Sequence, residues 1–356
     1  RLKPDISAKG SSVVSTTDVN DYTTKSGTSM SCPGVSGSFA QLYQAYKDIN
    51  AGALPASGLI KAAVLNTAED LGNPGPDFKY GWGRINNQRA FETLDKGYYL
   101  ADQLNNGDTN THSISVPANT KEVRIMLLWV DEEGSTSAAK ALVNNLDLEV
   151  SDPTSSTYLP WVLDPTPNAT ALNSNAVRGV DTLNNVEQVT IDNPASGNYI
   201  IEVRGTLIPS GPQNYHIAYY FVENELRLTY PNGGDSWVPG EAEVIRWDAF
   251  GNTGNFTLEY TTNQGANWTT ISNSISSSAR QYSWSVPSAA TGSVRMRITR
   301  GSVSDESDNN FSIIGVPENL QVDWACPDSI QLSWSPVAGA TEYEASKLGM
   351  MYMDSA

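Results

Sequence analysis

The sequence predicts a multidomain chain in which a partial α/β unit is followed by all-β sandwiches. Its length, 356 residues, corresponds to two to four domains at about 100–200 residues each. Apolar side chains recur at helical spacing only in the first part of the chain. From about Tyr98 onward, short apolar and β-branched runs alternate with Gly, Pro and Asn, which is the pattern of all-β sandwiches.

The longest helix of the α/β unit is expected over residues 33–48. Apolar side chains recur there every three or four positions, at Val35, Phe39, Leu42, Tyr43 and Tyr46. Ser31 lies near the expected start, and a proline such as Pro33 is tolerated in a first helical turn. We therefore expect this helix to bury one face.

Two shorter helices are expected after it. Ser57 is expected to cap a helix over residues 58–67, which has an apolar face. A third helix, over residues 87–94, follows the aromatic and glycine-rich turn at residues 80–83. The helical period ends after Asp95, so the α/β unit is expected to end there.

The rest of the chain is expected to form strands. Five of them are predicted over residues 122–130, 147–150, 187–191, 199–204 and 215–222. A new unit is expected near Leu226, and another at Pro317 that stops at Ala356; about forty residues are too few to bury both sheets of a sandwich. We therefore expect a fragment of a longer secreted protein. Its domains are predicted over residues 1–97, 98–223, 224–315 and 316–356.

Charge and composition exclude several partners. The chain has 39 acidic and 22 basic residues and a net charge of −17, whereas nucleic-acid binding needs clustered Lys and Arg. No apolar run approaches the roughly 18 residues of a membrane span, so no transmembrane segment is expected. The two cysteines, Cys32 and Cys326, lie near opposite ends of the chain and are not expected to pair. This cysteine usage favours an exported bacterial protein with large cores.

The stretch from Gly27 to Gly34 carries the candidate chemistry. Glycine lets a substrate backbone come close, and Ser29 stands where a loop turns into the first helix. A helix N-terminus offers N–H groups and partial positive charge, which stabilise the oxyanion formed when serine attacks a carbonyl. These residues favour acyl transfer by a serine nucleophile. The alternative, from these residues alone, is a plain N-terminal cap.

Three motifs in the first ninety residues resemble those of subtilases, the subtilisin-like serine peptidases. Lys-Pro-Asp-Ile-Ser-Ala at residues 3–8 resembles the strand before the nucleophile. Gly-Thr-Ser-Met-Ser-Cys-Pro at residues 27–33 resembles the serine motif, and Tyr-Gly-Trp-Gly-Arg-Ile-Asn at residues 80–86 resembles the closing turn. The resemblance implies that Arg1 to about Leu94 is the C-terminal part of a subtilisin-like domain acting on polypeptide substrates.

The same resemblance implies roles for three residues. Ser29 is the nucleophile and its own N–H is part of the oxyanion hole, Thr28 supports that hole, and Gly27 admits the substrate backbone. Two positions depart from the family pattern: Lys9 stands where many relatives have proline, and Gly34 replaces a frequent histidine. Neither position does chemistry in the family, so we expect altered packing and an unchanged mechanism.

The catalytic triad is incomplete in this sequence. Triad residues of subtilisins follow the order Asp, His, Ser along the chain. Only 28 residues precede Ser29 and none is histidine, while His112 and His216 fall in the predicted β region. We therefore expect the triad Asp and His upstream of this fragment. The parent protein is predicted to be an endopeptidase, and this chain alone is predicted to be inactive.

The segment from Thr111 to Glu223 resembles the jelly-roll domain behind the catalytic domain of some subtilases. The likeness is carried by residues 128–131, 142–148, 184–187, 194–199 and 211–215. In such relatives the domain stabilises the catalytic unit, often with bound calcium. Oxygen ligands of the kind that Ca²⁺ takes stand at Asp131, Asn145, Asp147, Asn185 and Glu187. The alternative is that these side chains cap turns and bind backbone groups.

The last third of the chain resembles two further modules. Residues 225–314 resemble immunoglobulin-like sandwiches of secreted bacterial proteins, and residues 317–352 resemble the first strands of a fibronectin type III domain, here truncated. Core or inter-sheet positions are expected for Trp237, Trp247, Trp268 and Trp284, and the alternative is an aromatic platform for sugar. These modules are candidates for contacts with extracellular polymers or with the cell surface.

Two functions of different classes remain. The first is a secreted or cell-surface bacterial serine endopeptidase of the subtilisin type with appended β modules. The second is a non-catalytic extracellular β-sandwich array for adhesion or binding, in which the subtilase remnant is only a folded cap. Calcium is the one cofactor considered, and no organic cofactor is expected.

Overall fold

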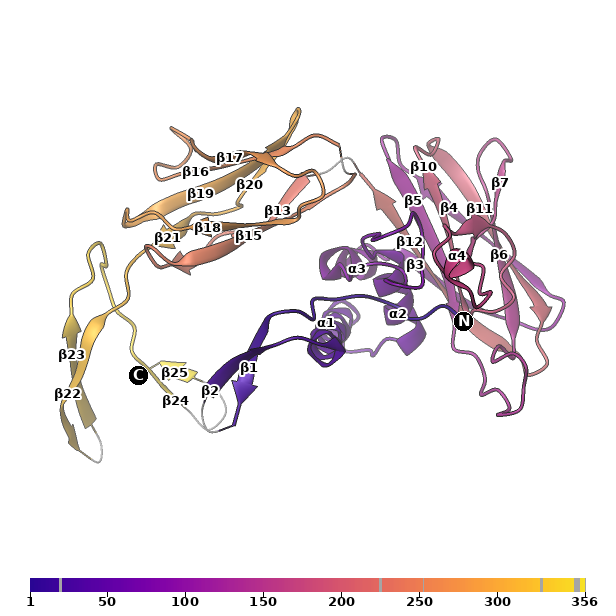
Figure 1. Ribbon diagram of the computed structural model, residues 1–356, viewed down its shortest axis with the longest axis horizontal. Coiled ribbons are helices and arrows are strands. Elements are labelled where there is room, and N and C mark those ends of the chain that lie inside the picture. The colour runs from indigo at the N-terminus through magenta and orange to yellow at the C-terminus, as the bar shows by residue number, and fades with distance from the viewer. Residues whose placement is uncertain (19–20, 224–225, 252, 327–328, 349–352, 356) are drawn as a thin grey trace. The chain divides into compact units, whose positions relative to one another are not determined.

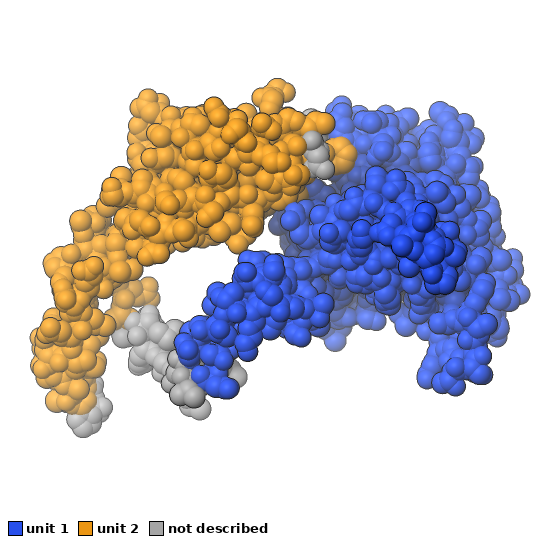
Figure 2. All heavy atoms as spheres, viewed as in Figure 1, with its two compact units in different colours: residues 1–223 blue, residues 224–356 orange. Residues whose placement is uncertain are grey.

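The chain divides into two compact units, residues 1–223 and residues 224–356 (Figure 2). The computed structural model describes residues 1–18, 21–223, 226–251, 253–326, 329–348 and 353–355. Each unit has a hydrophobic core of its own. The architecture is mostly β-sheet, as the sequence predicted, and the helices lie in the first unit (Figure 1).

The first ninety-odd residues of unit 1 form three helices and one hairpin. The helices are α1 (Thr28–Ile49), α2 (Ser57–Asn66) and α3 (Asn87–Asp95), and the hairpin joins β1 (Val13–Thr17) to β2 (Asp21–Lys25). The helices pack together through the buried residues Leu42, Leu59, Ile60, Ala63, Val64, Ala90 and Leu94. Figure 1 shows the hairpin extending away from the three helices.

Two details of the predicted helices are wrong. The helix expected from residue 33 begins at Thr28, so Pro33 lies inside it. Proline has no N–H to donate to the carbonyl oxygen four residues earlier, so the helix continues at the cost of one hydrogen bond. Ser57 does not cap α2: the N-cap is Ala56, and it makes no side-chain hydrogen bond. The third helix agrees with the prediction, and its N-cap Asn86 accepts a hydrogen bond from the Arg89 N–H.

The rest of unit 1 is a sandwich of two antiparallel four-stranded sheets. The first sheet has the order β10 (Val186–Asp192), β5 (Glu122–Trp129), β12 (Gln213–Val222), β3 (Tyr99–Leu104). The second has the order β4 (Thr109–Val116), β11 (Gly197–Leu207), β6 (Asn145–Ser151), β7 (Thr157–Tyr158). Between them lies a core whose largest side chains are Trp129, Tyr199 and Tyr215. All five strands expected here are present.

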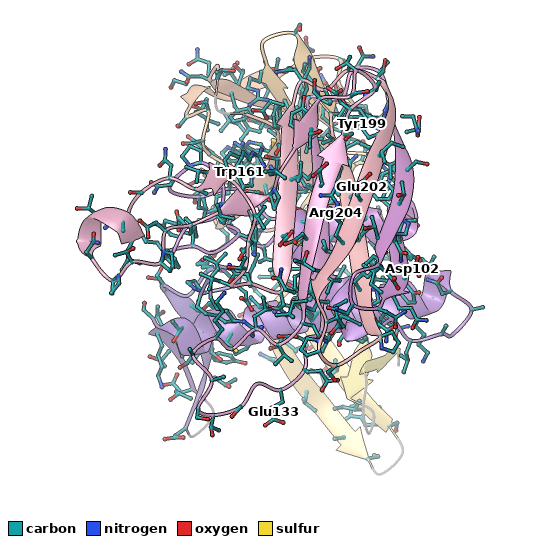
Figure 3. The ribbon with its side chains drawn as sticks, turned by 90° about the vertical axis from the view of Figure 1, so that its right-hand side faces the viewer. Asp102, Glu133, Trp161, Tyr199, Glu202 and Arg204 are labelled. Atoms are coloured by element: carbon teal, nitrogen blue, oxygen red, sulfur yellow. The ribbon has the colours of Figure 1, made fainter. Side chains whose placement is uncertain are left out.

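The hydrophobic patterns of β5 and β11 explain which sheet the helices cover. Strand β5 is an almost continuous apolar run, because one face lies in the sandwich core and the other, with Met126 and Leu128, packs against α2. Strand β11 alternates buried and more exposed residues, and Glu202 and Arg204 lie on the outer face of its sheet (Figure 3). That outer face is polar, and Arg204 pairs there with Glu202 and Glu149.

Helix α2 joins the helical part to the sandwich through one shared apolar cluster. Its side of the cluster includes Ala62 and Leu65, and the sheet side includes Met126, Leu128 and Ala218. Because these residues are buried only when both parts are together, the residues before and after position 97 form one compact unit. One short ladder, in which β8 (Trp161–Val162) pairs with β9 (Val177–Arg178), and one helical turn, α4 (Ala169–Leu172), also belong to unit 1.

Unit 2 begins with a second sandwich. One sheet has the order β13 (Leu226–Tyr230), β15 (Ala242–Ala249), β18 (Gln281–Ser285). The other contains β14 (Ser236–Trp237), β21 (Phe311–Ile313), β19 (Thr291–Arg300), β16 (Phe256–Thr261) and β17 (Thr269–Ile275), with β20 (Val303–Glu306) paired to β19. Trp237 and Trp247 are buried and Trp284 packs against the core, as expected, while Trp268 stacks on Arg297.

The end of unit 2 is two separate ladders. Strand β22 (Glu318–Cys326) pairs with β23 (Ser329–Ser335), and β24 (Ser346–Leu348) pairs with β25 (Met353–Ser355). Every residue of β22 is exposed, including Leu320 and Val322. None of the described helices is both long enough and apolar enough to cross a membrane.

Candidate functional site

The candidate nucleophile Ser29 lies in the first turn of α1. The ladder of β1 and β2 ends with Val13 opposite Lys25, and the chain then runs through Ser26 and Gly27 into the helix. The Ser12 N–H donates to the Ser26 Oγ at 2.9 Å, which holds the two sides of the hairpin together beyond the ladder. The start of α1 is therefore positioned by the hairpin.

Gly10 makes the closest backbone contact to this turn. The Gly27 N–H donates to the Gly10 carbonyl at 2.7 Å. A Cβ at position 10 would lie 2.7 Å from the Gly27 carbonyl oxygen and 3.3 Å from the Ser31 Cβ, so only glycine fits without a shift of the backbone. Gly10 was not among the residues expected at the site; its signal was its place after Lys9, where many relatives have Pro-Gly.

The polar groups of Ser29 are exposed. Within the described residues, neither the Ser29 Oγ nor the Ser29 backbone N–H makes a hydrogen bond. The next residue, Met30, donates its N–H to the Gly27 carbonyl at 3.0 Å. The neighbouring hydroxyl of Ser31 donates to the Thr28 carbonyl at 3.0 Å. Because Pro33 has no N–H, the Ser29 carbonyl also has no helical donor. Ser29 is thus an exposed residue in the first turn of a helix.

The other two sequence motifs are joined to each other by hydrogen bonds. The Ser7 N–H donates to the Gly83 carbonyl at 2.8 Å, and the Ile85 N–H donates to the Ser7 carbonyl at 2.9 Å. Ser7 and Arg84 form a parallel bridge, and Arg84 also bonds the Glu69 carboxylate. The strand segment, the serine turn and the closing turn are therefore one connected structure.

Neither histidine of the chain contacts Ser29. His112 lies in β4, where its Nε2 is 2.7 Å from the Tyr215 hydroxyl. His216 lies in β12 and packs against Gly58 of α2. Burial lowers the pKa of both imidazoles, and Asp102 partly offsets the shift for His112. A general base for Ser29 is therefore not supplied by either histidine.

The first three turns of α1 pack against little of the described structure. No residue from Thr28 to Ser38 is buried, and Leu42 is the one buried residue of the helix. Partly buried Phe39, Tyr43 and Tyr46 pack toward the other helices. Apart from its contact with Gly10, the serine end of α1 is consequently little covered by the described residues.

Two family models match parts of the chain. Residues 1–83 match the subtilase family. Residues 108–205 match the bacterial pre-peptidase C-terminal domain. The subtilase match covers the first two motifs completely and the third, residues 80–86, as far as Gly83.

Two curated relatives are serine proteases by name. An extracellular serine protease of Serratia marcescens is 43% identical over 88 residues, which cover 22% of this chain and 8% of that protein. The serine protease/ABC transporter B family protein tagA of Dictyostelium discoideum is 26% identical over 259 residues, covering 61% of this chain and 14% of that protein. The chain therefore spans a small part of the length of each relative.

One solved structure that aligns with this chain is a lipase of Bacillus licheniformis in its propeptide form. The alignment covers 62% of this chain and 41% of the lipase chain. The identity is 13% and the TM-score is 0.20. A likeness at that TM-score carries no argument about the fold, which rests on the strands and cores described above.

Two of the five expected calcium ligands are engaged in backbone contacts. Asp131 is almost completely buried and accepts hydrogen bonds from the Val143 and Asn144 N–H groups at 2.9 and 2.8 Å. The Asn185 amide donates to the Trp129 carbonyl at 2.7 Å. Both side chains thus hold the loops at the end of β5, which is the structural alternative that the sequence left open.

The other three expected ligands lie at the open edge of β6. Strand β7 pairs only with Val150 and Ser151, and Glu187 from the facing sheet accepts the Leu148 N–H of this edge at 2.7 Å. Asp147 bonds the amide of Asn145 and the hydroxyl of Thr206. Two buried oxygens have no hydrogen-bond partner among the described residues, Glu187 Oε1 and Asn145 Oδ1.

The Glu187 carboxyl has an unusual electrostatic environment. Burial raises its pKa well above the ordinary value, and the carboxylates of Asp181 and Asp147 raise it further, against the Leu148 hydrogen bond. Asp181 was not among the expected residues; its signal was its position just before the Asn184-Asn185 turn. No three His, Cys, Asp or Glu side chains of the described ranges are grouped so that they could hold a metal ion.

Proposed function

We propose that this chain belongs to a subtilisin-like serine endopeptidase and that Ser29 is its nucleophile. The observation that carries the proposal is the subtilase match over residues 1–83, with Ser29 exposed at the N-terminus of α1. The identity to an extracellular serine protease supports the same activity. The substrates are polypeptides, as for serine endopeptidases in general.

The proposal gives roles to three residues of the turn. The Ser29 Oγ attacks the scissile carbonyl, and the Ser29 N–H donates to the resulting oxyanion; Ser29 is exposed at the start of α1, which supports both roles. Thr28 supports the oxyanion hole from the first helical position. Gly27, which has no side chain, lets the substrate backbone approach the nucleophile.

The base is expected outside these 356 residues. A serine hydroxyl at neutral pH needs a base to become an effective nucleophile. In subtilisin itself, loss of one triad residue lowers the rate by on the order of 10⁴–10⁶. We therefore propose that the triad Asp and His lie upstream and that residues 1–356 alone do not hydrolyse peptides.

A fluorophosphonate probe tests both statements. We expect the product of the complete gene to be labelled, its Ser29→Ala variant to stay unlabelled, and the 356-residue chain to stay unlabelled. Ser36→Ala is the matched control, since Ser36 is an exposed serine of the same helix and its loss should leave labelling intact. An unlabelled full-length product would defeat the peptidase proposal, and stoichiometric labelling of the isolated chain would defeat its inactivity.

We also place the protein outside the cell, secreted or at the surface of a bacterium. The name of the Serratia relative supports an extracellular setting. The net charge of −17 supports solubility there and disfavours nucleic acid as a partner. The β modules after residue 98 are the surfaces proposed for contacts with extracellular polymers.

A calcium site at the β6 edge is the second part of the proposal. The fit of Ca²⁺ is supported by the two unpartnered buried oxygens of Glu187 and Asn145, with Asp147 next to them. Asp131 and Asn185 are engaged in backbone contacts and would need to rearrange to join them. Bound Ca²⁺ would supply the positive charge that lets Glu187 ionise. The three residues would then join the two sheets.

Thermal unfolding with calcium and with a chelator tests the site. A ligand that binds only the folded state raises its stability, so the chelator should lower the Tm of the wild-type chain. Glu187→Gln keeps the shape and the acceptor for Leu148 and removes the charge, so its Tm should not respond to calcium. If the wild-type Tm does not respond either, Glu187 is a protonated structural residue and there is no site.

The non-catalytic adhesion array is the competing function. The four tryptophans considered for a sugar platform do not favour it, because Trp237, Trp247 and Trp284 lie in or against the core and Trp268 is stacked on Arg297. The coding sequence upstream of Arg1 separates the two functions: Asp and His motifs there support the peptidase.

A further inference from the structure

The contact between α2 and the first sheet of the sandwich contains one titratable ring. His216 of β12 pairs in register with Leu128 of β5 and Ala101 of β3, so its side chain lies on the sheet face that α2 covers. A Cβ at Gly58 of α2 would lie 2.6 Å from the His216 Cδ2 and 3.2 Å from its Nε2. The helix backbone therefore touches the imidazole, and glycine is what allows it.

The two ring nitrogens of His216 differ in their surroundings. The Nδ1 atom is buried and has no hydrogen-bond partner among the described residues. The ring as a whole is half-buried, and its neighbours Gly58 and Leu128 line a cavity of about 380 Å³. In the neutral ring the proton can stay on Nε2, leaving Nδ1 as an empty acceptor. A second proton would place a donor and a charge at the buried Nδ1.

Glu132 lines the same cavity as Gly58 and Leu128, and most of the other surrounding charged groups already have partners. From the packed elements these are Lys61 with Asp5, Arg124 with Glu122, and Tyr220 with Glu92, together with Arg1 and Asp131 after β5. Two more titratable groups lie on β3: Tyr99, whose ring is close to Tyr46, and Asp102, which acts on His112 and Tyr215. Burial alone lowers the pKa of His216, and none of the described charges offsets it.

We propose that His216 makes the packing of α2 on the sandwich acid-labile, so that protonation of its ring loosens the subtilase-like residues from the sheet. If Nδ1 is protonated, its N–H has no hydrogen-bond acceptor nearby among the described residues. Gly58 lies against the ring, so the charged ring cannot turn toward an acceptor while the helix stays in place. The cavity beside the contact gives water a route to the ring. The device is conformational and does not depend on the proposed peptidase activity.

The direction of the pH effect follows from linkage. The folded-state pKa of His216 lies below its ordinary value, so the unfolded or opened form binds the proton first as the pH falls. The contact is therefore fully stable above the ordinary histidine pKa of about 6.5 and weakens as the pH falls through the lowered folded-state pKa. Neutral pH keeps α2 docked.

Hydrogen exchange on the 356-residue chain tests the proposal. After correction for intrinsic exchange rates, the amides of α2 (Ser57–Asn66) should lose about tenfold protection between pH 7.5 and 5.5, which corresponds to about 1.4 kcal/mol of opening free energy. His216→Phe keeps a planar ring and cannot titrate, so its α2 protection should be the same at both pH values. His112→Gln, which removes the other histidine, should keep the wild-type response.

Three results would overturn the proposal. These are unchanged α2 protection in the wild-type chain, an undiminished pH response in His216→Phe, or loss of the response in His112→Gln. If His216→Phe fails to fold, imidazole NMR of the wild-type chain decides the matter without a variant. A titration midpoint for His216 below 6.5, coincident with the loss of α2 protection, supports the proposal, and a midpoint at or above 6.5 rejects it.

Discussion

Single residues decide how the serine turn is built. Ser29 is exposed with no recorded hydrogen bond at its Oγ, whereas the neighbouring Ser31 hydroxyl is already bonded to the Thr28 carbonyl. Two serines in one helical turn therefore differ in whether their hydroxyl group is already hydrogen-bonded. The difference comes from position along the helix: the Ser31 hydroxyl reaches the carbonyl three residues earlier, at Thr28, whereas the residue three positions before Ser29 lies outside the helix.

The close contact of Gly10 gives a prediction at this scale. Gly10→Ala should destabilise unit 1 by about 1–3 kcal/mol, because its Cβ would overlap the Gly27 carbonyl and force the serine turn to move. Urea unfolding of the chain measures the change. Gly34→Ala is the control: nothing lies within 4 Å of its Cβ in α1, so alanine should be neutral or stabilising by up to about 1 kcal/mol. Equal behaviour of the two variants would refute the argument.

Elements of structure differ in how firmly they are held. Helix α2 is buried along most of its length between α1, α3 and the sheet, whereas α1 has one buried residue in 22. Packing an amphipathic face provides most of the stability of a protein helix. The two helices next to each other in sequence are therefore held to very different degrees.

Leu42 should be the residue that anchors α1. Leu42→Ala is expected to cost about 2–5 kcal/mol, because it removes the buried side chain of α1 from the helical core. Leu54→Ala makes the same chemical change at a side chain that is 74% exposed, and should change stability by less than about 0.5 kcal/mol. Denaturant unfolding compares them. A Leu42→Ala variant as stable as Leu54→Ala would mean that α1 is anchored elsewhere.

At the scale of the whole molecule, the cores set the folding units. The cluster shared by α2 and the first sheet joins residues before position 97 to residues after it. A second, separate core lies beyond residue 224. Of the four apolar clusters among the described residues, three lie in residues 1–223 and one lies in residues 224–356.

Truncation tests this division. Residues 1–97 expressed alone should be poorly soluble, because Ala62, Leu65 and Trp82 lose the sheet residues that cover them. Residues 1–223 should fold in one cooperative transition, and residues 224–356 should fold without them. Circular dichroism melts and size-exclusion chromatography of the three fragments provide the measurement. A sharp melt of residues 1–97 alone would contradict the shared core.

Much of the fold was predictable because its signals are local. The five strands of the first sandwich and the helix after Asn86 were expected from periodicity and turn residues within a few positions of each element. The start of α1 was misplaced because proline was taken as a boundary, although a helix tolerates the loss of one hydrogen bond near its N-terminus. The N-cap of α2 was misplaced by one residue, because serine is a preferred N-cap residue and was chosen over the neighbouring Ala56.

By itself, the sequence determined the serine motif, the absence of any histidine before Ser29 and the change from helical to β pattern. Only the tertiary structure decided which oxygen-bearing side chains are already bonded, as in Asp131, and which are buried without a partner, as in Glu187. It also placed His216 against Gly58, 158 residues away in the chain (216 − 58). The reason is physical: burial and hydrogen-bond partners depend on what distant segments bring to the same place, and no local pattern contains that information.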